Sequence, residues 1–199
     1  GKNLDNWKVA SSGNPIAKGW EIIDGELVAN KNKEIKGDGD ISTKQEFGPF
    51  ELKFDFKLTE GANNGIKYGI GNNGPNFGLE YQILDDEKHP DAKQGVVGNR
   101  TLASLYDLIP AEKDPRFIKK IGEWNQGRIV VYPDNTVQHW LNGRKVVEYK
   151  RGSNIYKALV ARSKYAAHEN FGMAEKTPIL ITDHHDEVYF RSIKIRELK

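Results

Sequence analysis

The clearest pattern in the chain is strict alternation of apolar and polar residues. In Phe50-Glu51-Leu52-Lys53-Phe54-Asp55-Phe56-Lys57-Leu58 every second side chain is apolar, which predicts a strand buried on one face. Similar short runs recur between turns rich in Gly, Asn, Asp and Pro, at residues 25–29, 66–70, 79–84, 128–132, 136–141, 145–149, 179–182 and 188–195. Many short strands with little helical periodicity predict an all-β protein, either a sandwich or a barrel.

Turn residues and one helical segment refine this picture. Pro133-Asp134-Asn135 and Asn142-Gly143 separate neighbouring strands, and Asn-Gly is a strong signal for a tight hairpin. A single short helix is predicted from a Ser153 cap to about Ala167, as a surface insertion. The long polar stretches 85–107 and 106–122 contain no clear element. We expect them to carry function, as long loops in compact domains usually do.

Composition limits the class of protein. With 199 residues and 37% hydrophobic content, the chain predicts one domain over residues 1–199. The 30 basic and 28 acidic side chains leave a net charge of +2, which favours neither nucleic acid nor an anionic membrane as partner. Cys is absent, which excludes disulfides and thiolate chemistry. No apolar run is long enough to cross a bilayer. Because the chain starts at Gly1 without a Met, we expect that a targeting segment was removed.

One motif invites a nucleotide-binding interpretation that its context argues against. Gly69-Ile70-Gly71-Asn72-Asn73-Gly74 fits G-x-G-x-x-G, but a pyrophosphate site needs a helix N-terminus after the glycines. Pro75 and a predicted strand at 79–84 follow instead. We therefore expect this motif to be the turn of a hairpin.

The strand 79–84 places a carboxylate and an amide on one face. Glu80 and Gln82 alternate with apolar side chains, so they project together from the sheet. Sugar hydroxyls are both donors and acceptors, and a face with these groups suits them. An ordinary solvated sheet face explains the same pattern, and both interpretations stay open at this stage.

A second group of polar side chains lies between two predicted strands. Thr182-Asp183-His184-His185-Asp186-Glu187 supplies both metal ligands and general acid or base groups, although a polar turn has the same composition. The other histidines, among them His139, are scattered, and each alone is more often a packing or surface residue than a ligand.

The order of these motifs resembles the bacterial 3-keto-disaccharide hydrolase family. The resemblance is carried by Gly19-Trp20-Glu21-Ile22, Asp24-Gly25-Glu26-Leu27, Ser42-Thr43-Lys44 with Phe47, Asn64-Gly65-Ile66, Leu79-Glu80-Tyr81-Gln82-Ile83-Leu84-Asp85, Gly122-Glu123-Trp124-Asn125, Leu141-Asn142-Gly143 and the segment 188–196. Each motif is weak alone, whereas the shared order is specific. It implies a concanavalin A-like antiparallel β-sandwich, a jelly roll with one short helical insertion.

The chain also departs from the family pattern at two points. The family's Ile-x-Leu-Gln-Asp-His-Gly segment is Ile179-Leu180-Ile181-Thr182-Asp183-His184-His185 here, which keeps Asp183 and His184 and loses the amide and the glycine. The Gly-Ala-Ile-Tyr segment is Leu102-Ala103-Ser104-Leu105-Tyr106, which keeps only the tyrosine. A different substrate or a weaker activity is compatible with these changes.

What the resemblance implies is a hydrolase that cleaves oxidised, 3-keto glycosides by C2-proton abstraction, elimination and water addition. Carrying the roles over residue by residue makes Glu80 and His184 the proton-transfer candidates, with Asp183 orienting His184 or binding a divalent cation. No metal ligand is assigned. The candidate residues for binding carbohydrate are Asn64, Lys67, Gln82, Tyr106, Trp124 and His139.

Two other functions remain open from sequence. One is a carbohydrate-binding module without catalysis, since fold does not decide function. The other is a conventional glycosidase with two carboxylates, for which Glu80 has no partner of matching spacing. The resemblance further implies a periplasmic or secreted protein, lipid-anchored before processing in some relatives. Sequence leaves the oligomeric state open.

Overall fold

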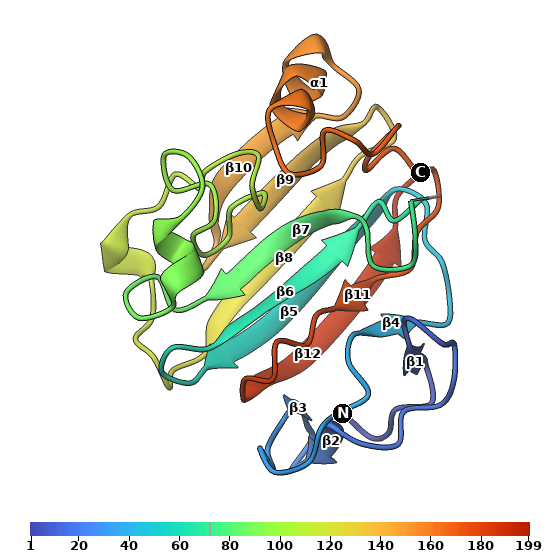
Figure 1. Ribbon diagram of the computed structural model, residues 1–199, viewed down its shortest axis with the longest axis vertical. Coiled ribbons are helices and arrows are strands. Elements are labelled where there is room, and N and C mark those ends of the chain that lie inside the picture. The colour runs from blue at the N-terminus through green and yellow to red at the C-terminus, as the bar shows by residue number, and fades with distance from the viewer. Residues whose placement is uncertain (72) are drawn as a thin grey trace.

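The computed structural model describes residues 1–71 and 73–199 as two antiparallel sheets packed face to face. The sheet nearer the viewer in Figure 1, here called the front sheet, has the strand order β1-β4-β11-β6-β7, and the back sheet has the order β10-β9-β8-β5-β12-β3-β2. The front strands are β1 (Trp7–Val9), β4 (Ile41–Thr43), β11 (Leu180–Ile181), β6 (Asn63–Tyr68) and β7 (Leu79–Leu84). The back strands are β10 (Arg144–Lys150), β9 (Thr136–Leu141), β8 (Asn125–Val131), β5 (Phe50–Leu58), β12 (Val188–Glu197), β3 (Glu26–Ala29) and β2 (Trp20–Ile23). The predicted antiparallel sandwich is confirmed.

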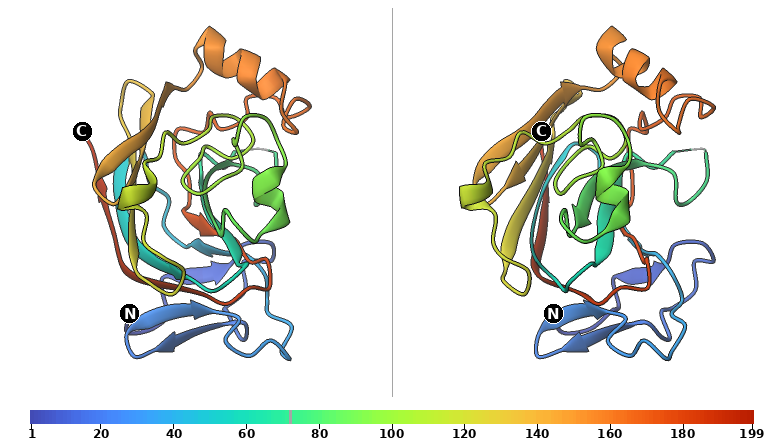
Figure 2. Two further views of the ribbon diagram at one scale, coloured as in Figure 1. Left: turned by 90° about the vertical axis from the view of Figure 1, so that its left-hand side faces the viewer. Right: turned by 60° about the vertical axis from the view of Figure 1, so that its left-hand side comes forward.

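The core lies between the two sheets, as Figure 2 shows from the side. Every apolar residue of the alternating run in β5 is buried, and its polar neighbours face the other way, as the pattern predicts. Across the layers, the rings of Phe54 and Tyr81 meet edge to face with centroids 5.3 Å apart. This geometry is preferred by aromatic pairs and adds about 0.5–1.5 kcal/mol to the effect of burial.

The predicted hairpins are present. β8 and β9 are antiparallel neighbours, and Asn135 in their turn has φ 69°. Asn142 and Gly143 both have positive φ, 49° and 79°, as a type I′ turn between β9 and β10 requires. The G-x-G-x-x-G segment joins β6 to β7, which pair antiparallel, so the hairpin interpretation is confirmed; Asn72 within it lies outside the described residues.

One α-helix is present where it was predicted. α1 (Asn154–Ala161) begins after Ser153, whose hydroxyl accepts a hydrogen bond from the Tyr156 amide and so caps the helix. The helix ends earlier than the predicted Ala167, because the chain turns at Arg162. Short 3₁₀ turns, η1 (Pro90–Lys93) and η2 (Pro115–Phe117), lie in the long polar stretch. None of the helices in the described part of the chain has the length and apolar character of a membrane span.

The loop at 85–109 and the segment after α1 lie at the outer face of the front sheet (Figures 1 and 2). The strands β6, β7 and β11 therefore form a floor, and these two segments form walls around it. Residues 112–122 run along the back sheet instead, where the Glu112 amide donates to the Val146 carbonyl and the Gly122 amide to the Leu58 carbonyl. The short strands β1, β2 and β4 were not predicted as strands. Each has three or four residues, too few for alternation to be recognised.

Candidate active site

The floor of the candidate site is set by strand register. β6 and β7 place Gly65 opposite Gln82 and Lys67 opposite Glu80. On the other side of β6, the Thr182 amide donates to the Gly65 carbonyl at 2.9 Å, which extends the pairing beyond β11. Because the alternate residues Ile66 and Tyr81 lie in the core, the side chains of Lys67, Glu80 and Gln82 project from the outer face.

Glu80 is the central acidic group of this floor. The residue is only 5% exposed, and its carboxylate makes no hydrogen bond or ion pair with the described residues. A Cβ atom built on Gly65 would collide with Glu80 Oε1, so the carboxylate lies over the bare backbone of the adjacent strand. A buried carboxylate normally has partners, and one without them is available to a ligand.

Tyr106 reaches Glu80 because the loop before it pairs with the free edge of β7. The Ala103 amide donates to the Gln82 carbonyl at 2.7 Å, and the Tyr106 amide donates to the Glu80 carbonyl at 3.0 Å. A left-handed residue at Ala103, with φ 65°, turns the chain into this register. The backbone of Tyr106 is thus fixed beside that of Glu80.

A network of charged groups fixes Tyr106 in this position. Its hydroxyl donates to Asp91 Oδ2 at 2.8 Å. Arg100 donates to Asp91 Oδ1 at 3.0 Å and to Asp107 Oδ1 at 2.7 Å, and its guanidinium lies 5.3 Å from the Tyr106 ring centroid. Burial raises the pKa of Tyr106 well above its usual range, and the hydrogen bond to Asp91 raises it further. The phenol is therefore neutral at physiological pH.

Asp107 joins the two walls of the site. One oxygen of its carboxylate accepts from Arg100, and the other accepts from the backbone amide of Lys164 at 2.9 Å. The ammonium group of Lys164 then lies over the Tyr106 ring, 4.1 Å from its centroid, and 5.2 Å from that of Tyr165. Burial lowers the pKa of Lys164, and the nearby negative charge of Glu80 acts in the opposite direction by raising it. Lys164 thus belongs to the surroundings of Glu80.

Two further polar side chains of the floor are buried without full pairing. Gln82 and Thr182 are each 1% exposed. The amide nitrogen of Gln82 donates to Asn63 Oδ1 at 3.3 Å, but Gln82 Oε1 and Thr182 Oγ1 have no partner among the described residues. Both residues flank Gly65, below the carboxylate of Glu80. Unpaired polar atoms at such a position fit a surface that hydrogen-bonds a polar ligand.

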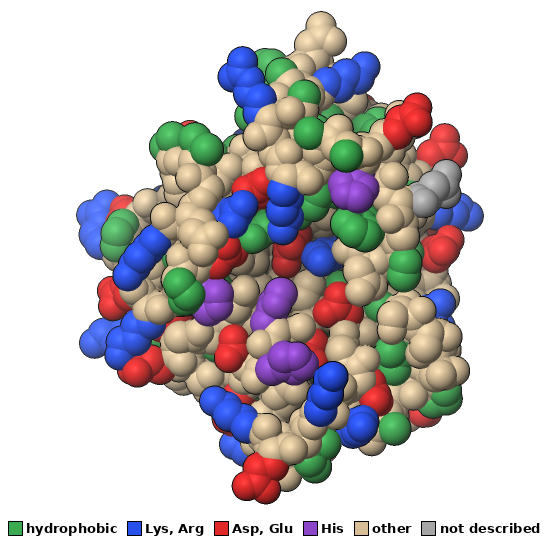
Figure 3. Space-filling model, in the orientation of Figure 1, with side chains coloured by type: hydrophobic (Ala, Val, Ile, Leu, Met, Phe, Trp, Pro, Cys, Tyr) green, Lys and Arg blue, Asp and Glu red, His purple; other side chains and the backbone are tan. Residues whose placement is uncertain are grey.

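Figure 3 shows this face of the molecule. Acidic and basic side chains lie together in a hollow over the front sheet, and histidine side chains lie around it. The combination of carboxylate, ammonium, phenol and amide groups in one hollow suits a ligand that carries many hydroxyl groups.

His184 and Asp183 lie beyond the end of β11, and they are not paired as the sequence suggested. His184 is exposed. The carboxylate of Asp183 accepts instead from the amide of Asn30 at 2.5 Å and from the backbone amide of His185 at 2.7 Å. No hydrogen bond joins Asp183 to His184 in the described part of the chain. The expected orienting role of Asp183 is therefore not seen; its carboxylate holds the turn at residues 183–187.

The same contacts bear on the predicted cation site. Asp183 Oδ1 accepts from two donors, whereas Oδ2 is buried and has no hydrogen-bond partner among the described residues. Within residues 1–71 and 73–199, no three side chains of the His, Asp or Glu type are arranged to hold a metal ion. The described residues thus give no set of three ligands for a divalent cation at the Asp183–His184 segment.

Asn64 and His139 lie away from the hollow, inside the protein. Asn64 is 1% exposed, and its amide donates to the Thr182 carbonyl at 2.5 Å, which ties β6 to the chain after β11. His139 is fully buried between the Tyr68 hydroxyl at 2.6 Å and the Ala103 carbonyl at 3.0 Å. Both residues support the floor from below.

Trp124 lies on the outer face of the back sheet. Its ring is covered by the guanidinium of Arg191, at 4.0 Å, and by the ammonium of Lys57, at 4.7 Å, both from strands of that sheet. The sandwich therefore separates Trp124 from Glu80, although both were predicted to contact the same ligand.

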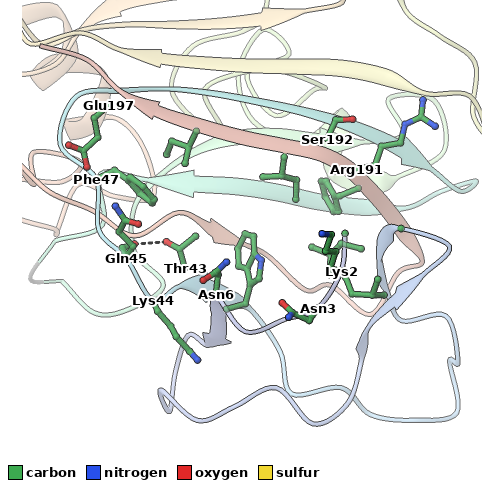
Figure 4. A pocket seen from close by; sticks show the side chains of 18 residues that line it. Lys2, Asn3, Asn6, Thr43, Lys44, Gln45, Phe47, Arg191, Ser192 and Glu197 are labelled. Atoms are coloured by element: carbon green, nitrogen blue, oxygen red, sulfur yellow. Dashed lines mark hydrogen bonds between the residues drawn. The ribbon is translucent and has the colours of Figure 1, made fainter.

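A separate groove of about 960 Å³ lies between the N-terminal segment and β12 (Figure 4). Its polar lining comes from Lys2, Asn3, Asn6, Lys44 and Arg191, among others. None of the residues predicted from sequence lines it, and its carboxylate, Glu197, comes from the end of β12. Size alone does not make it the active site.

Five residues of the walls were not predicted from the sequence: Asp91, Arg100, Asp107, Lys164 and Tyr165. These residues lie in segments without periodicity, and their contacts join positions far apart in the chain. The only available signal was the length and polarity of the loop between 85 and 122.

The matches to known proteins identify the family. The model of the 3-keto-alpha-glucoside-1,2-lyase-like domain matches residues 1–196. The chain belongs to this family. It is 34% identical over 232 aligned positions to the 3-keto-disaccharide hydrolase of Bacteroides thetaiotaomicron, a match that covers the whole chain and 76% of that relative. The predicted family and the predicted hydrolase class are confirmed.

Solved structures support the same assignment. A candidate glycosyl hydrolase from Parabacteroides distasonis superposes with a TM-score of 0.84 and 30% identity, covering all of this chain and 92% of that one. The carbohydrate-binding module CBM66 of Bacillus subtilis superposes with a TM-score of 0.57 and 9% identity over 98% of both chains. The latter likeness shows the sandwich fold alone.

Proposed function

We propose that this family member cleaves the glycosidic bond of 3-keto glycosides, with Glu80 as the base that removes the proton from C2. The observation that carries the proposal is the carboxylate of Glu80, which is almost buried, unpaired and placed on a floor of polar groups. A ketone at C3 acidifies the C2 hydrogen, which makes a carboxylate a sufficient base.

The steps balance without a redox partner. Glu80 takes the C2 proton, and the electron pair of that bond moves into an enolate on the C3 oxygen. Collapse of the enolate breaks the bond between C1 and the glycosidic oxygen, which leaves with a proton from an acid. Water then adds its oxygen to C1, and a proton returns to C2. His184 remains the candidate acid, since it is exposed at the border of the floor.

The two names among the matches correspond to two end points of this sequence. Elimination alone, as in a lyase, gives an unsaturated ketone, whereas elimination followed by hydration, as in a hydrolase, gives a free 3-keto sugar. The proposal for this chain includes both steps. Its substrate is an oxidised disaccharide or glycoside, held by Tyr106, Gln82 and Lys67, and its place of action is the periplasm or the exterior of the cell.

The test is incubation of the purified protein with 3-keto-trehalose, with and without EDTA, followed by chromatography of the released sugars. Release of glucose and of the keto sugar supports both steps, whereas accumulation of the unsaturated ketone would support elimination and contradict the hydration step. Glu80→Gln keeps the shape of the side chain and removes the base, so we expect kcat to fall by at least about 100-fold. Measurable sugar binding without any release by the wild type would favour a carbohydrate-binding module instead.

A further inference from the structure

Three charged side chains at the site, those of Glu80, Lys67 and Lys164, have no ion-pair partner among the described residues. Lys67 lies opposite Glu80 across β6 and β7, and Lys164 reaches over Tyr106, the residue whose amide binds the Glu80 backbone. Neither ammonium group forms an ion pair with a described residue. Arg100, in contrast, is paired with both Asp91 and Asp107. The ammonium groups of Lys67 and Lys164 are therefore the cations of the site that no described carboxylate pairs.

Unpaired ammonium groups near Glu80 suit a reaction that moves negative charge off its carboxylate. When the carboxylate accepts a proton it becomes neutral, and the substrate oxygen becomes the anion that faces the ammonium groups. A cation placed nearer to the new anion than to the carboxylate stabilises the transition state more than the ground state. A charge that is already in place before the reaction needs no reorganisation when the anion forms.

Lys164 fits this role better than Lys67. The ammonium of Lys67 donates to the Asn76 carbonyl at 3.1 Å, and its strand position keeps it beside Glu80 throughout. The ammonium of Lys164 has no hydrogen-bond acceptor among the described residues. It is held instead by the faces of two aromatic rings, Tyr106 and Tyr165, which orient a cation without using its N–H donors. Those donors are free to bind an oxyanion.

The backbone of Lys164 is fixed as well. Its amide donates to Asp107 Oδ2, and the neighbouring Tyr165 stacks on Phe171 with ring centroids 4.0 Å apart. The side chain therefore starts from an anchored position in the wall, opposite the strand that carries Glu80.

We infer that Lys164 is a catalytic residue whose ammonium group binds the C3 oxygen and stabilises the enolate that forms when Glu80 removes the C2 proton. The inference rests on the proposed function and adds the group that receives the negative charge. The proton and charge balance are those given above, and Lys164 keeps its own protons throughout.

The experiment compares Lys164→Met and Lys164→Arg with the wild type. Lys157→Met is the matched control, since Lys157 lies earlier in the same segment, on α1. Two substrates are used: a 3-keto disaccharide, and 4-nitrophenyl 3-keto-glucoside, whose leaving group needs no acid. A third compound, the 3-keto derivative of 1,5-anhydroglucitol, has no leaving group, so exchange of its C2 hydrogen in D₂O, followed by NMR, reports enolate formation alone.

We expect Lys164→Met to lower kcat about 100-fold on both substrates and to slow C2 exchange by a similar factor, as expected for loss of an oxyanion-stabilising group. KM should change little. Lys164→Arg should recover about 10-fold of the lost rate, and Lys157→Met should match the wild type. Melting curves of all variants show whether the fold is kept.

Two results would overturn the inference. If Lys164→Met is slow on the disaccharide but normal on the nitrophenyl substrate and in C2 exchange, Lys164 is the acid of the leaving group. If it is normal in every assay, Lys164 has no catalytic role. Absence of both sugar release and C2 exchange in the wild type would instead refute the proposed function itself.

Discussion

The carboxylate of Glu80 lies over the backbone of Gly65, on the neighbouring strand of the front sheet, where a Cβ atom would collide with it. Gly65 does not adopt a positive φ, so its backbone accepts other residues. Gly65→Ala should therefore displace the carboxylate and lower kcat at least about 10-fold, because misplacement of a reacting group by about an ångström is costly.

Gly48→Ala serves as the control for this prediction, since a Cβ atom there meets only the Glu175 carbonyl, at 4.0 Å. Both variants should be compared by kcat on a 3-keto glycoside and by thermal melting. Full activity in a folded Gly65→Ala protein would mean that the position of Glu80 over Gly65 is not needed for the reaction.

Removal of Trp124 should leave catalysis unchanged. Its ring lies on the outer face of the back sheet between Arg191 and Lys57, on the far side of the core from Glu80. We expect Trp124→Ala to keep kcat/KM within about two-fold of the wild type while lowering stability by about 1 kcal/mol through lost cation–π contacts. Steady-state kinetics and urea unfolding measure the two effects. A large rise in KM would place substrate on the back sheet.

His139 should make stability depend on pH. The Ala103 carbonyl can only accept, so His139 Nδ1 carries the proton and Nε2 accepts from the Tyr68 hydroxyl. Burial lowers the pKa of His139 from 6.5 to about 4. As the pH falls below 6.5, the unfolded chain binds a proton at His139 that the folded protein does not bind. The folded state therefore becomes less stable relative to the unfolded state, down to about pH 4.

From pH 7 to 4.5 this single group should cost about 2–3 kcal/mol of unfolding free energy. Urea unfolding of the wild type and of His139→Gln at both pH values isolates the contribution of His139 to the unfolding free energy. All other titratable groups are the same in the two proteins, so their contributions cancel. His139→Gln should be less stable at pH 7, and the difference should shrink at pH 4.5. An unchanged difference would show that His139 is protonated in the fold.

Asp107 should be needed for the geometry of both walls. Asp107→Asn keeps a residue that tolerates its φ of 62° but removes the charge that binds Arg100. We expect a loss of about 1–2 kcal/mol in stability, a lower kcat/KM, and faster hydrogen exchange at the amide of Lys164. Asp134→Asn, in an exposed turn with Lys150, is the control. Unchanged exchange at Lys164 would show that the two walls are fixed independently.

Alternation was sufficient to predict the long strands and the facing of their side chains. The run from Phe50 to Leu58 and the strand from Leu79 to Leu84 have the predicted bounds, because the apolar side chains of each strand all face the core. That same reasoning placed Glu80 and Gln82 on one face, as observed. Where the strand is irregular, as in β12, whose register shifts between Arg191 and Lys194, alternation fails.

The walls of the site could not be derived in this way. Lys164 reaches Glu80 only through the loop pairing at Tyr106 and the hydrogen bond to Asp107, which joins positions separated by 57 residues. Nothing in the local sequence specifies such contacts. His139 is an error of another kind. It was predicted to bind carbohydrate, although its position in the strand directs its side chain into the core.

The hydrogen bond from Thr182 to Gly65 has a consequence for how the protein acquires activity. It joins the floor strand β6 to a segment near the end of the chain, so the floor is complete only after distant parts of the polypeptide have met. Contacts of such long sequence separation form slowly. Recovery of activity during refolding should therefore follow the slowest phase of the return of native fluorescence, and any chain that lacks its last segment should remain inactive however much β-structure it forms.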